Sequence, residues 1–290
     1  MDAKCVAAQV LSLHRFSLCD GHSLVPQPLV SASASSRCRC ATSFWYIVGV
    51  CNLLNMSDEF MLKEAQQGHT KAVTDEIKKG AKVNFADTYG RTAIFYAAAG
   101  NFLDLVKALI SAGADVNAAA DEGTALHAAS KKGYLDIVKL LVDSKADVNA
   151  LGDMRKTPLH KAIGDSRVEV ATFLISKGAA VDAKTVTEVE PLHLACAEGL
   201  TDFAVFLLSK GAKVNCRNQN LKTPLHIAAE KNNLQLVKKL LMAGADTNME
   251  DIWGRKASVC GNHYIENLIV NHKPGMVYED PVGDDSDDEE

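Results

Sequence analysis

The feature that most constrains this chain is a short phrase that returns every 32 or 33 residues. It reads Thr-Pro-Leu-His at 157–160 and 223–226 and Glu-Pro-Leu-His at 190–193, with weaker copies at 92–95 and 124–127. A second phrase, of the form Gly-Ala-Asp-Val-Asn, keeps a fixed distance from the first. Two phrases in phase over six cycles are typical of a repeat protein, in which each unit buries its apolar face against its neighbours.

Each copy of the first phrase predicts the start of a helix. Thr is a good N-cap because its hydroxyl accepts a hydrogen bond from a first-turn N–H that has no partner within the helix. Pro at the next position loses nothing, since its missing N–H would have no partner there. Behind the copy at 223–226, apolar residues at helical spacing over 236–241 predict a second helix, and Gly244 follows where a helix end favours positive φ. Each unit is therefore expected to be a pair of helices.

A period of 33 residues that carries Thr-Pro-Leu-His-x-Ala resembles the ankyrin repeat. The resemblance covers residues 56–275 and implies an all-α solenoid of stacked helix-turn-helix units with β-hairpin fingers. The expected units are an N-terminal cap at 56–86, full repeats at 87–119, 120–151, 152–184, 185–217 and 218–250, and a C-terminal cap at 251–275. The second full repeat lacks one residue before its first helix, so we expect a shortened finger there and an intact helix pair.

The two ends of the chain carry neither phrase. Residues 1–55 are Ser-rich, with only two acidic residues and five of the eight cysteines. This composition predicts a disordered leader or an upstream extension of a reading frame that starts at Met56, and a transit peptide for an organelle is the alternative. Residues 276–290 hold eight acidic residues and no basic one, which predicts a disordered acidic tail. Within it, Ser286 resembles the site of an acidophilic Ser/Thr kinase.

Charge and cysteine content narrow the class of protein. Residues 56–275 contain 27 basic and 26 acidic residues, and no block is basic enough to indicate nucleic-acid binding. The longest apolar run, 44–54, is too short to span a bilayer. The cysteines in the repeats have no disulfide-like spacing, as in a cytosolic protein. We therefore expect a monomer that is located in the cytoplasm, and the alternative is that it is also located in the nucleus. We expect it to bind no cofactor and no metal, and neither nucleic acid nor a membrane.

Four histidines stand in register at the ends of the tetrads: His127, His160, His193 and His226. They could form a catalytic or metal-binding array, and Cys196 lies one helical turn after one of them. The resemblance instead implies that this histidine hydrogen-bonds to neighbouring units and braces the stack. The tetrad threonines that belong to the same structural motif are Thr124, Thr157 and Thr223. No carboxylate pair, Gly-rich phosphate loop or nucleophile motif recurs with them, so we expect no enzyme activity.

Asn117 and Asn149 end two copies of the second phrase. They resemble the substrates of the asparaginyl hydroxylase that modifies ankyrin repeats. The alternative is that these amides stabilise the turn beneath the finger.

The resemblance also implies that a partner binds the concave face, formed by the finger tips and the first helices. There the bases that precede successive first helices are expected to form a basic row, which is interrupted at Val189 and at the deletion. Its members are Arg91, Lys156, Lys222 and Arg255. Bulky residues at the finger tips are expected in solvent unless a partner covers them, although Trp253 packing onto the terminal unit is an alternative. The predicted partner contacts are Tyr89, Arg91, Lys156, Lys222, Ile252, Trp253 and Arg255.

Taken together, the sequence predicts a non-enzymatic scaffold or regulator that binds another protein. Two narrower alternatives are a proteasome-assembly chaperone of the gankyrin type, favoured only by the number of units, and an adaptor or substrate receptor for a modifying enzyme. A further hypothesis is that the acidic tail covers the basic row until a partner displaces it.

Overall fold

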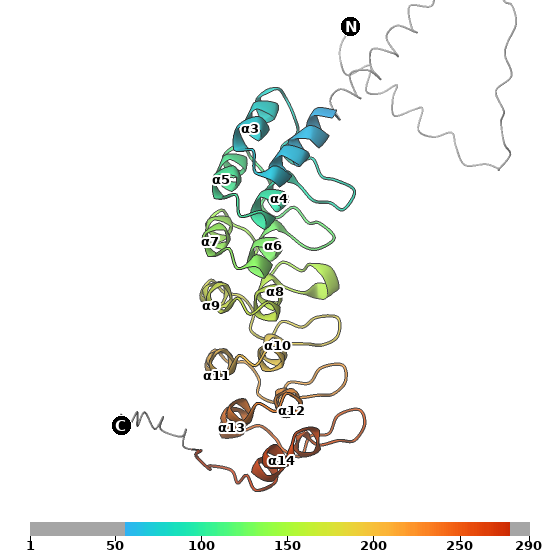
Figure 1. The fold of residues 1–290 in the computed structure, drawn as a ribbon, viewed down its shortest axis with the longest axis vertical. Helices are drawn as coiled ribbons and strands as arrows, with labels where there is room; N and C mark the ends of the chain where they lie inside the picture. The colour runs from blue at the N-terminus through green and yellow to red at the C-terminus, as the bar shows by residue number, and fades with distance from the viewer. Residues whose placement is uncertain (1–55, 279–290) are drawn as a thin grey trace, which may run out of the picture. The chain divides into compact units, whose positions relative to one another are not determined.

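The computed structural model describes residues 56–278, which form a stack of helix pairs (Figure 1). The first unit consists of a helix over residues 56–67 and α3 (Thr70–Lys78). The pairs that follow are α4 (Ala93–Ala99) and α5 (Leu103–Ser111), α6 (Ala125–Lys132) and α7 (Leu135–Asp143), α8 (Pro158–Gly164) and α9 (Val168–Ser176), α10 (Pro191–Ala197) and α11 (Thr201–Ser209), and α12 (Pro224–Glu230) and α13 (Leu234–Met242). The last unit pairs a 3-10 turn, η3 (Ala257–Cys260), with α14 (His263–Val270).

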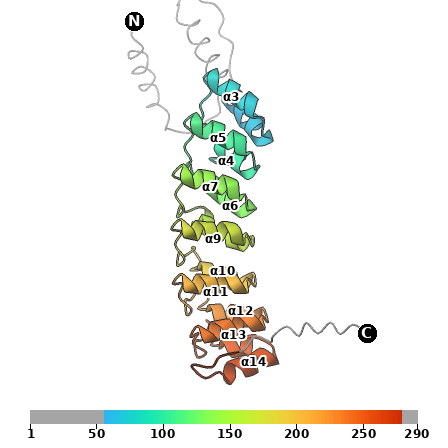
Figure 2. The same cartoon turned by 90° about the vertical axis from the view of Figure 1, so that its left-hand side faces the viewer.

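The helices lie in two layers. Helices α4, α6, α8, α10 and α12 form the layer next to the fingers, and α3, α5, α7, α9, α11 and α13 form the other (Figures 1 and 2). The finger-side helices carry a fully buried alanine at one repeated position, which lets neighbouring helices approach closely. These alanines are Ala97, Ala129, Ala162, Ala195 and Ala228.

The second layer supplies the larger apolar side chains. Each of its full-repeat helices buries two of them one turn apart, as Ile137 and Leu141 do on α7 and Leu236 and Leu240 do on α13. The buried residues form one continuous core along the stack from Met61 to Ile269. Full burial of such a side chain contributes about 1.5–3 kcal/mol, so the core between units holds the stack together. Within residues 56–278, no helix is long and apolar enough to cross a membrane.

The fingers that join the units are tight turns, the short form of the expected β-hairpins. They comprise residues 87–91, 120–123, 152–156, 185–189, 218–222 and 251–255. In the described part of the chain, strand pairing is limited to three isolated bridges, Ala86 with Thr92, Ala120 with Gly123 and Glu250 with Lys256. The arms of each finger are too short for a ladder to extend beyond one pair.

A side chain at the first position of the finger closes several of these turns. The Asp87 Oδ1 atom accepts hydrogen bonds from the backbone N–H groups of Tyr89 and Arg91, at 2.8 and 2.9 Å. Asn218 and Asp251 do the same in their own fingers. Short polar side chains that bond their own backbone two residues on are favoured in turns for this reason.

Adjacent fingers are also tied to each other. One backbone hydrogen bond of 3.0–3.1 Å links the fingers at four of the five junctions: Asp121 N–H to Tyr89 C=O, Val186 to Met154, Gln219 to Thr187, and Ile252 to Asn220. In the described residues, the junction between the second and third fingers lacks such a bond.

The missing bond follows from the one-residue deletion. The second finger is a short turn in which Ala120 and Gly123 exchange backbone hydrogen bonds, and α6 and α7 are intact, so this prediction is confirmed. Gly152 packs directly on that turn, where an added Cβ would lie 3.0 Å from the Glu122 carbonyl oxygen and the Gly123 Cα. Gly152 occupies the position that carries the turn-closing side chain in other fingers. The deletion and the glycine are therefore a compensating pair.

Candidate protein-binding surface

The four tetrad histidines connect each unit to the next. In each, the ring Nε2 lies 2.9–3.2 Å from a backbone carbonyl of the following unit: Lys156 for His127, Val189 for His160, Lys222 for His193 and Arg255 for His226. Because a carbonyl oxygen only accepts, Nε2 must carry the proton. The other ring nitrogen, Nδ1, accepts the backbone N–H of the tetrad's first residue at 3.0–3.2 Å.

This arrangement modifies the predicted role of the tetrad threonines. The Thr157 hydroxyl accepts from the His160 backbone N–H only at the long distance of 3.4 Å, whereas it lies 2.8 Å from that residue's ring Nδ1. Thr223 has the same close contact to His226. The histidine ring thus plays the part that Glu or Gln takes in a capping box, in which a side chain reaches back to the N-cap backbone N–H.

The environment of the histidines keeps them neutral. Burial lowers the pKa of His127 and of His193 from the ordinary value of 6.5 to about 4, and it also lowers the pKa of His160 and His226. A proton added at Nδ1 would face a backbone N–H donor. The histidines therefore act as fixed hydrogen-bonding links between units.

Glu190 replaces the tetrad threonine in the fourth full repeat, and its surroundings differ accordingly. It is 3 % exposed, and its Oε2 atom has no hydrogen-bond partner. Burial raises the pKa of Glu190, and burial also raises the pKa of the nearby Cys216 thiol, whose sulfur lies 3.7 Å from His193 Nδ1. A protonated, buried thiol beside a histidine whose two nitrogens are both engaged cannot act as a nucleophile. This cluster is structural.

Asn117 and Asn149 bridge consecutive units. The Asn117 Oδ1 accepts from the Asp147 N–H at 2.8 Å and its amide nitrogen donates to the Lys145 carbonyl at 3.2 Å. Asn149 makes the equivalent pair of bonds to Ala180 and Gly178. Their geometry accounts for a role in bracing the turn, and their hydroxylation stays a prediction.

The remaining predicted contacts lie on the finger face, which we define as the six fingers with α4, α6, α8, α10 and α12 beside them. At its N-terminal end, the Arg91 guanidinium lies over the Tyr89 ring, 4.6 Å from the centroid, and its Nε donates to Asp87 at 2.9 Å. Tyr96 on α4 donates its hydroxyl to the same carboxylate at 2.6 Å. Burial and this hydrogen bond raise the pKa of Tyr96 to about 12.

The C-terminal end repeats this arrangement. The Arg255 guanidinium lies 4.7 Å from the Trp253 ring centroid and donates to Asp251 at 2.8 Å. Burial alone would raise the pKa of Asp251, but the hydrogen bonds from Arg255 and Trp253 lower it to about 2. Lys222 covers the same indole at 5.5 Å. Two aromatic–arginine–aspartate modules therefore mark the two ends of the finger face.

The basic row does not present four free charges. Arg91 pairs with Asp87, Arg255 pairs with Asp251, and the Lys222 ammonium lies 2.6 Å from Glu230 on α12. Glu230 also lies 3.6 Å from Arg255, so it bridges two members of the row. Among the described residues, Lys156 is the member of the predicted row that forms no ion pair. Sequence reasoning missed these pairings because the acids lie four or eight residues away, on turns and helices.

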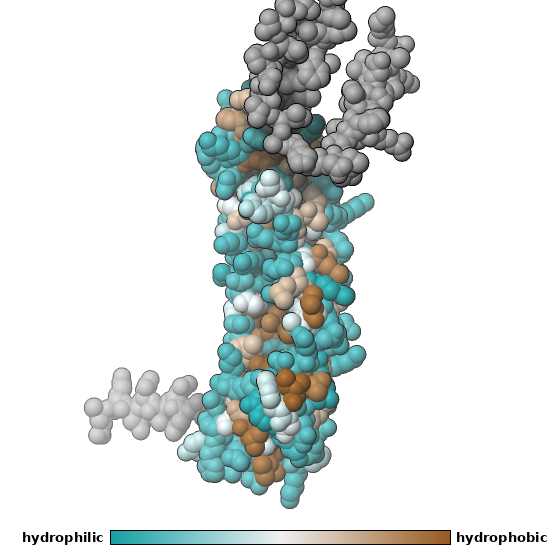
Figure 3. Space-filling view, turned by 90° about the vertical axis from the view of Figure 1, so that its right-hand side faces the viewer, coloured by the Kyte–Doolittle hydropathy of each residue, from teal (hydrophilic) through white to brown (hydrophobic). Residues whose placement is uncertain are grey.

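The finger tips expose apolar side chains to solvent, and hydrophobic side chains gather on this face in the space-filling view (Figure 3). Trp253 is 59 % exposed, so it does not pack onto the terminal unit. Tyr89, Met154 and Ile252 are exposed as predicted. Val186 and Leu221 are exposed too; of the two, sequence reasoning missed Leu221, although an aliphatic side chain in a turn was a usable signal.

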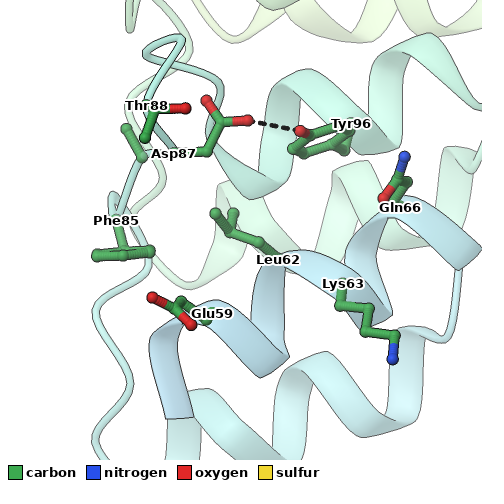
Figure 4. Close-up of a pocket in the computed structure, with 9 residues that line it drawn as sticks. Glu59, Leu62, Lys63, Gln66, Phe85, Asp87, Thr88 and Tyr96 are labelled. Carbon is green, nitrogen blue, oxygen red and sulfur yellow. Dashed lines mark hydrogen bonds between the residues drawn. The ribbon is translucent and has the colours of Figure 1, made fainter. Parts of the chain in front are cut away.

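A pocket of about 350 Å³ adjoins the N-terminal module (Figure 4). Leu62 on the helix over 56–67 and Phe85 before the first finger supply apolar walls, and Asp87 and Tyr96 meet at its edge. The pocket extends the finger face onto the first unit.

Residues 56–278 contain no group of three or more His, Cys, Asp or Glu residues that could hold a metal ion. Cys196 and Cys216 are buried, Cys260 is half-buried, and none of the three is in a disulfide. Ser286, the leader and the acidic residues of the tail lie outside the described residues.

Comparison with known proteins agrees with this architecture. The family model for ankyrin repeats in three copies matches residues 61–152, 119–185, 150–218 and 181–251. Among solved structures, the ankyrin-repeat domain of human ASB11 is similar, with a TM-score of 0.65 and 25% sequence identity over 74% of this chain and 99% of that chain. Comparison with curated proteins gives no match. The predicted ankyrin solenoid is confirmed, and ankyrin repeats are generally protein–protein interaction modules, typically without enzyme activity.

Proposed function

Because the chain belongs to the ankyrin-repeat family, we propose that it is a non-enzymatic scaffold or regulator that binds one partner protein through its finger face. This face corresponds to the concave face expected from the sequence. The observation that carries the proposal is the pair of modules at its two ends, Tyr89 with Arg91 and Trp253 with Arg255.

The modules have the properties of binding hot spots. Trp, Tyr and Arg dominate the energetics of interfaces when they are held in place before the partner arrives. Here each arginine is fixed by its aspartate and by the aromatic ring, so little side-chain entropy is lost on binding. More than half of each aromatic side chain is nevertheless open to solvent. Rigid, exposed aromatic surface is suited to docking a partner.

Several exposed apolar residues lie between the two modules. Met154, Val186 and Leu221 are on consecutive fingers, and backbone hydrogen bonds tie the fingers of Met154 and Val186 together. An interface of standard size buries about 1,600 Å² in total, which requires several adjacent units. We place the contact along the finger face between the two modules, with Trp253 as its anchor. In this proposal the protein acts as a monomer in the cytoplasm, and the alternative is that it also acts in the nucleus.

The test is an affinity capture from native lysate with the full chain as bait, read by mass spectrometry. Three baits are compared: the unchanged protein, Trp253→Ala and Tyr264→Ala. Tyr264 is a matched control because it is an even more exposed aromatic residue, 78 % exposed, on α14 and away from the fingers.

We expect a protein that the unchanged bait and Tyr264→Ala both hold and that Trp253→Ala loses. Purified with the chain, that protein should bind at least about tenfold more weakly to Trp253→Ala, the size of effect typical of a hot spot. Equal recovery by all three baits would contradict the assignment of the finger face as the binding surface.

A further inference from the structure

Two junctions between units occupy equivalent places along the finger face. At one position of the junction, one of them has an acidic residue and the other a basic residue. In the fifth full repeat, Glu230 stands four residues after His226 and lies between Lys222 and Arg255, both of which it neutralises. In the second full repeat, the residue four positions after His127 is Lys131. His127 donates to the Lys156 carbonyl as His226 donates to that of Arg255, so Lys131 and Lys156 correspond in position to Glu230 and Arg255.

A third lysine, Lys161, belongs to the same junction as Lys131 and Lys156. Lys161 is on α8, which packs against the Lys131-bearing helix α6, and it is half-buried. Other repeats carry Tyr96, Leu194 or Ile227 at this position. Burial lowers the pKa of Lys161, and the charges of Lys156 and Lys131 lower it further. The Lys161 ammonium is thus repelled by both of the other lysines, and we call Lys131, Lys156 and Lys161 the lysine cluster.

The cluster is not neutralised from within the described chain. Between residues 56 and 278, none of Lys131, Lys156 and Lys161 has an ion-pair partner within 4.0 Å. The charges of Asp153 and Glu122, on the two neighbouring fingers, raise the pKa of Lys161 and only partly offset the effect of its lysine neighbours. A carboxylate is therefore missing at the position where Glu230 supplies one.

We infer that the lysine cluster is a docking site for an acidic segment of the partner protein, whose carboxylates take the place that Glu230 fills in the fifth repeat. The inference rests on the proposed function, since it assigns a charge to the partner that the finger face binds. It also assigns the partner's neighbouring side chains, which meet Met154 and Val186 on the adjoining fingers and are therefore apolar.

The surroundings favour an acidic peptide over a nucleic acid. A phosphodiester backbone carries charge along its whole length and needs an extended basic surface. Here Asp121, Glu122 and Asp153 flank the three lysines, and the third and fourth fingers expose the apolar side chains of Met154 and Val186. A short acidic segment matches a site of this size and leaves the flanking acids in solvent.

The test measures binding of a fluorescent oligoglutamate peptide to the full chain by anisotropy at low salt, with an oligoglutamine peptide as the uncharged probe. Lys131→Glu copies the fifth repeat and gives Lys156 an internal partner, and Lys161→Leu copies the fourth. Lys139→Glu, on the exposed side of α7 in the other layer, is the charge-matched control. Thermal unfolding of each variant reports folding, and Lys131→Glu should unfold at the same or a higher temperature because it relieves repulsion.

We expect the unchanged chain to bind oligoglutamate and not oligoglutamine. Lys131→Glu and Lys161→Leu should each weaken the affinity about tenfold, the scale of one charge-assisted contact, and Lys139→Glu should leave it unchanged. No binding by the unchanged chain, or an equal loss in Lys139→Glu, would overturn the inference.

Two further measurements distinguish the acidic tail from a partner as the occupant of the cluster, and distinguish failure of this inference from failure of the proposed function. A chain that ends at Tyr278 lacks the acidic tail; if it binds the probe more than about tenfold better than the full chain, the tail itself occupies the cluster and the assignment to a partner is wrong. Failure of the peptide experiment alongside Trp253-dependent capture would reject the lysine cluster and leave the proposed function standing.

Discussion

The histidine links and the fingers lie only a few residues apart in every unit, yet they use the repeat in opposite ways. The links place the same atoms at nearly the same distances four times over, each ring 2.9–3.2 Å from the next unit's carbonyl, and all four rings are buried. The fingers keep only the backbone turn and expose a different side chain at each tip. Stability is therefore concentrated in what the units share, and recognition in what they do not. The predictions below test that division, from the largest expected effect to the smallest.

Acid should weaken the stack through the histidine links. His127 and His193 have folded-state pKa values of about 4 against 6.5 when unfolded, which corresponds to roughly 3 kcal/mol each. Because the unfolded chain binds these protons more readily, stability should be constant above pH 6.5 and fall as the pH drops toward 4. The raised pKa of Glu190 acts with the opposite sign above about pH 4.5 and offsets part of the loss. Urea unfolding from pH 7.5 to 4.5 measures the slope.

The control for this slope is an exposed histidine. His263 has a side chain that is 80% exposed, and His263→Gln should leave the pH dependence unchanged. A stability that stays flat between pH 6.5 and 4.5 would show that the tetrad histidines titrate normally and do not hold the neutral form.

Removal of a single link should cost about 3 kcal/mol. His160→Ala leaves the Thr157 N–H and the Val189 carbonyl without their partner and creates a cavity between α8 and the next unit. Trp253→Ala removes a larger side chain from a finger tip and should change the free energy of unfolding by no more than about 0.5 kcal/mol. Urea unfolding of both variants makes the comparison directly. Equal losses would break the division between links and fingers.

The third finger should be an exception to the division between stabilising links and fingers, because a substitution in this finger should destabilise the protein. Gly152→Asp introduces the residue found at the same position in the first and sixth fingers, but its Cβ would lie 3.0 Å from the Glu122 carbonyl oxygen and from His127 Nε2. We expect a loss of about 2 kcal/mol from overpacking. Insertion of an arginine between Gly123 and Thr124, as Arg91 stands between Gly90 and Thr92, should restore the stability of the Asp variant. An insertion that fails to do so would refute the compensating pair.

Glu190→Thr should stabilise the protein by about 1–2 kcal/mol at pH 7. The substitution restores the residue of the third and fifth repeats and removes a buried carboxylate oxygen that has no partner. Glu190→Gln separates the effect of the unpartnered buried oxygen from that of the titrating carboxylate, because it keeps the shape of the side chain and removes the titrating group. Its stability should lose only the part of the pH dependence above pH 4.5 that Glu190 contributes, without the full gain, and the fall caused by the histidines should remain. Thermal unfolding of the three proteins across that range measures both effects.

Periodicity predicted the repeat fold, because the fold depends on residues that recur, and the resemblance to ankyrin repeats implied the histidine links. The charge state of the finger face was not predictable in the same way. The sequence shows Arg91, Lys222 and Arg255 as a row of bases, but whether a base is free depends on acids such as Glu230 that come into reach only when the units stack. The length of the finger arms was not predictable either, and strand pairing in the described residues is limited to isolated bridges at the first, second and sixth fingers.

The effect of Leu221 should be the smallest and separates backbone strain from surface chemistry. Leu221 has a φ of 55°, where Gly90 and Gly254 stand in the first and sixth fingers with φ of 74° and 69°. Left-handed backbone costs an ordinary side chain about 1 kcal/mol, and Asn tolerates it better than Leu without the chain entropy that Gly adds to the unfolded state. Leu221→Asn should therefore stabilise the protein by about 0.5 kcal/mol. Val186→Asn, at an exposed finger residue outside that conformation, is the control and should give no gain in urea unfolding; an equal gain in both would mean that loss of exposed apolar surface, and not relief of strain, is the cause.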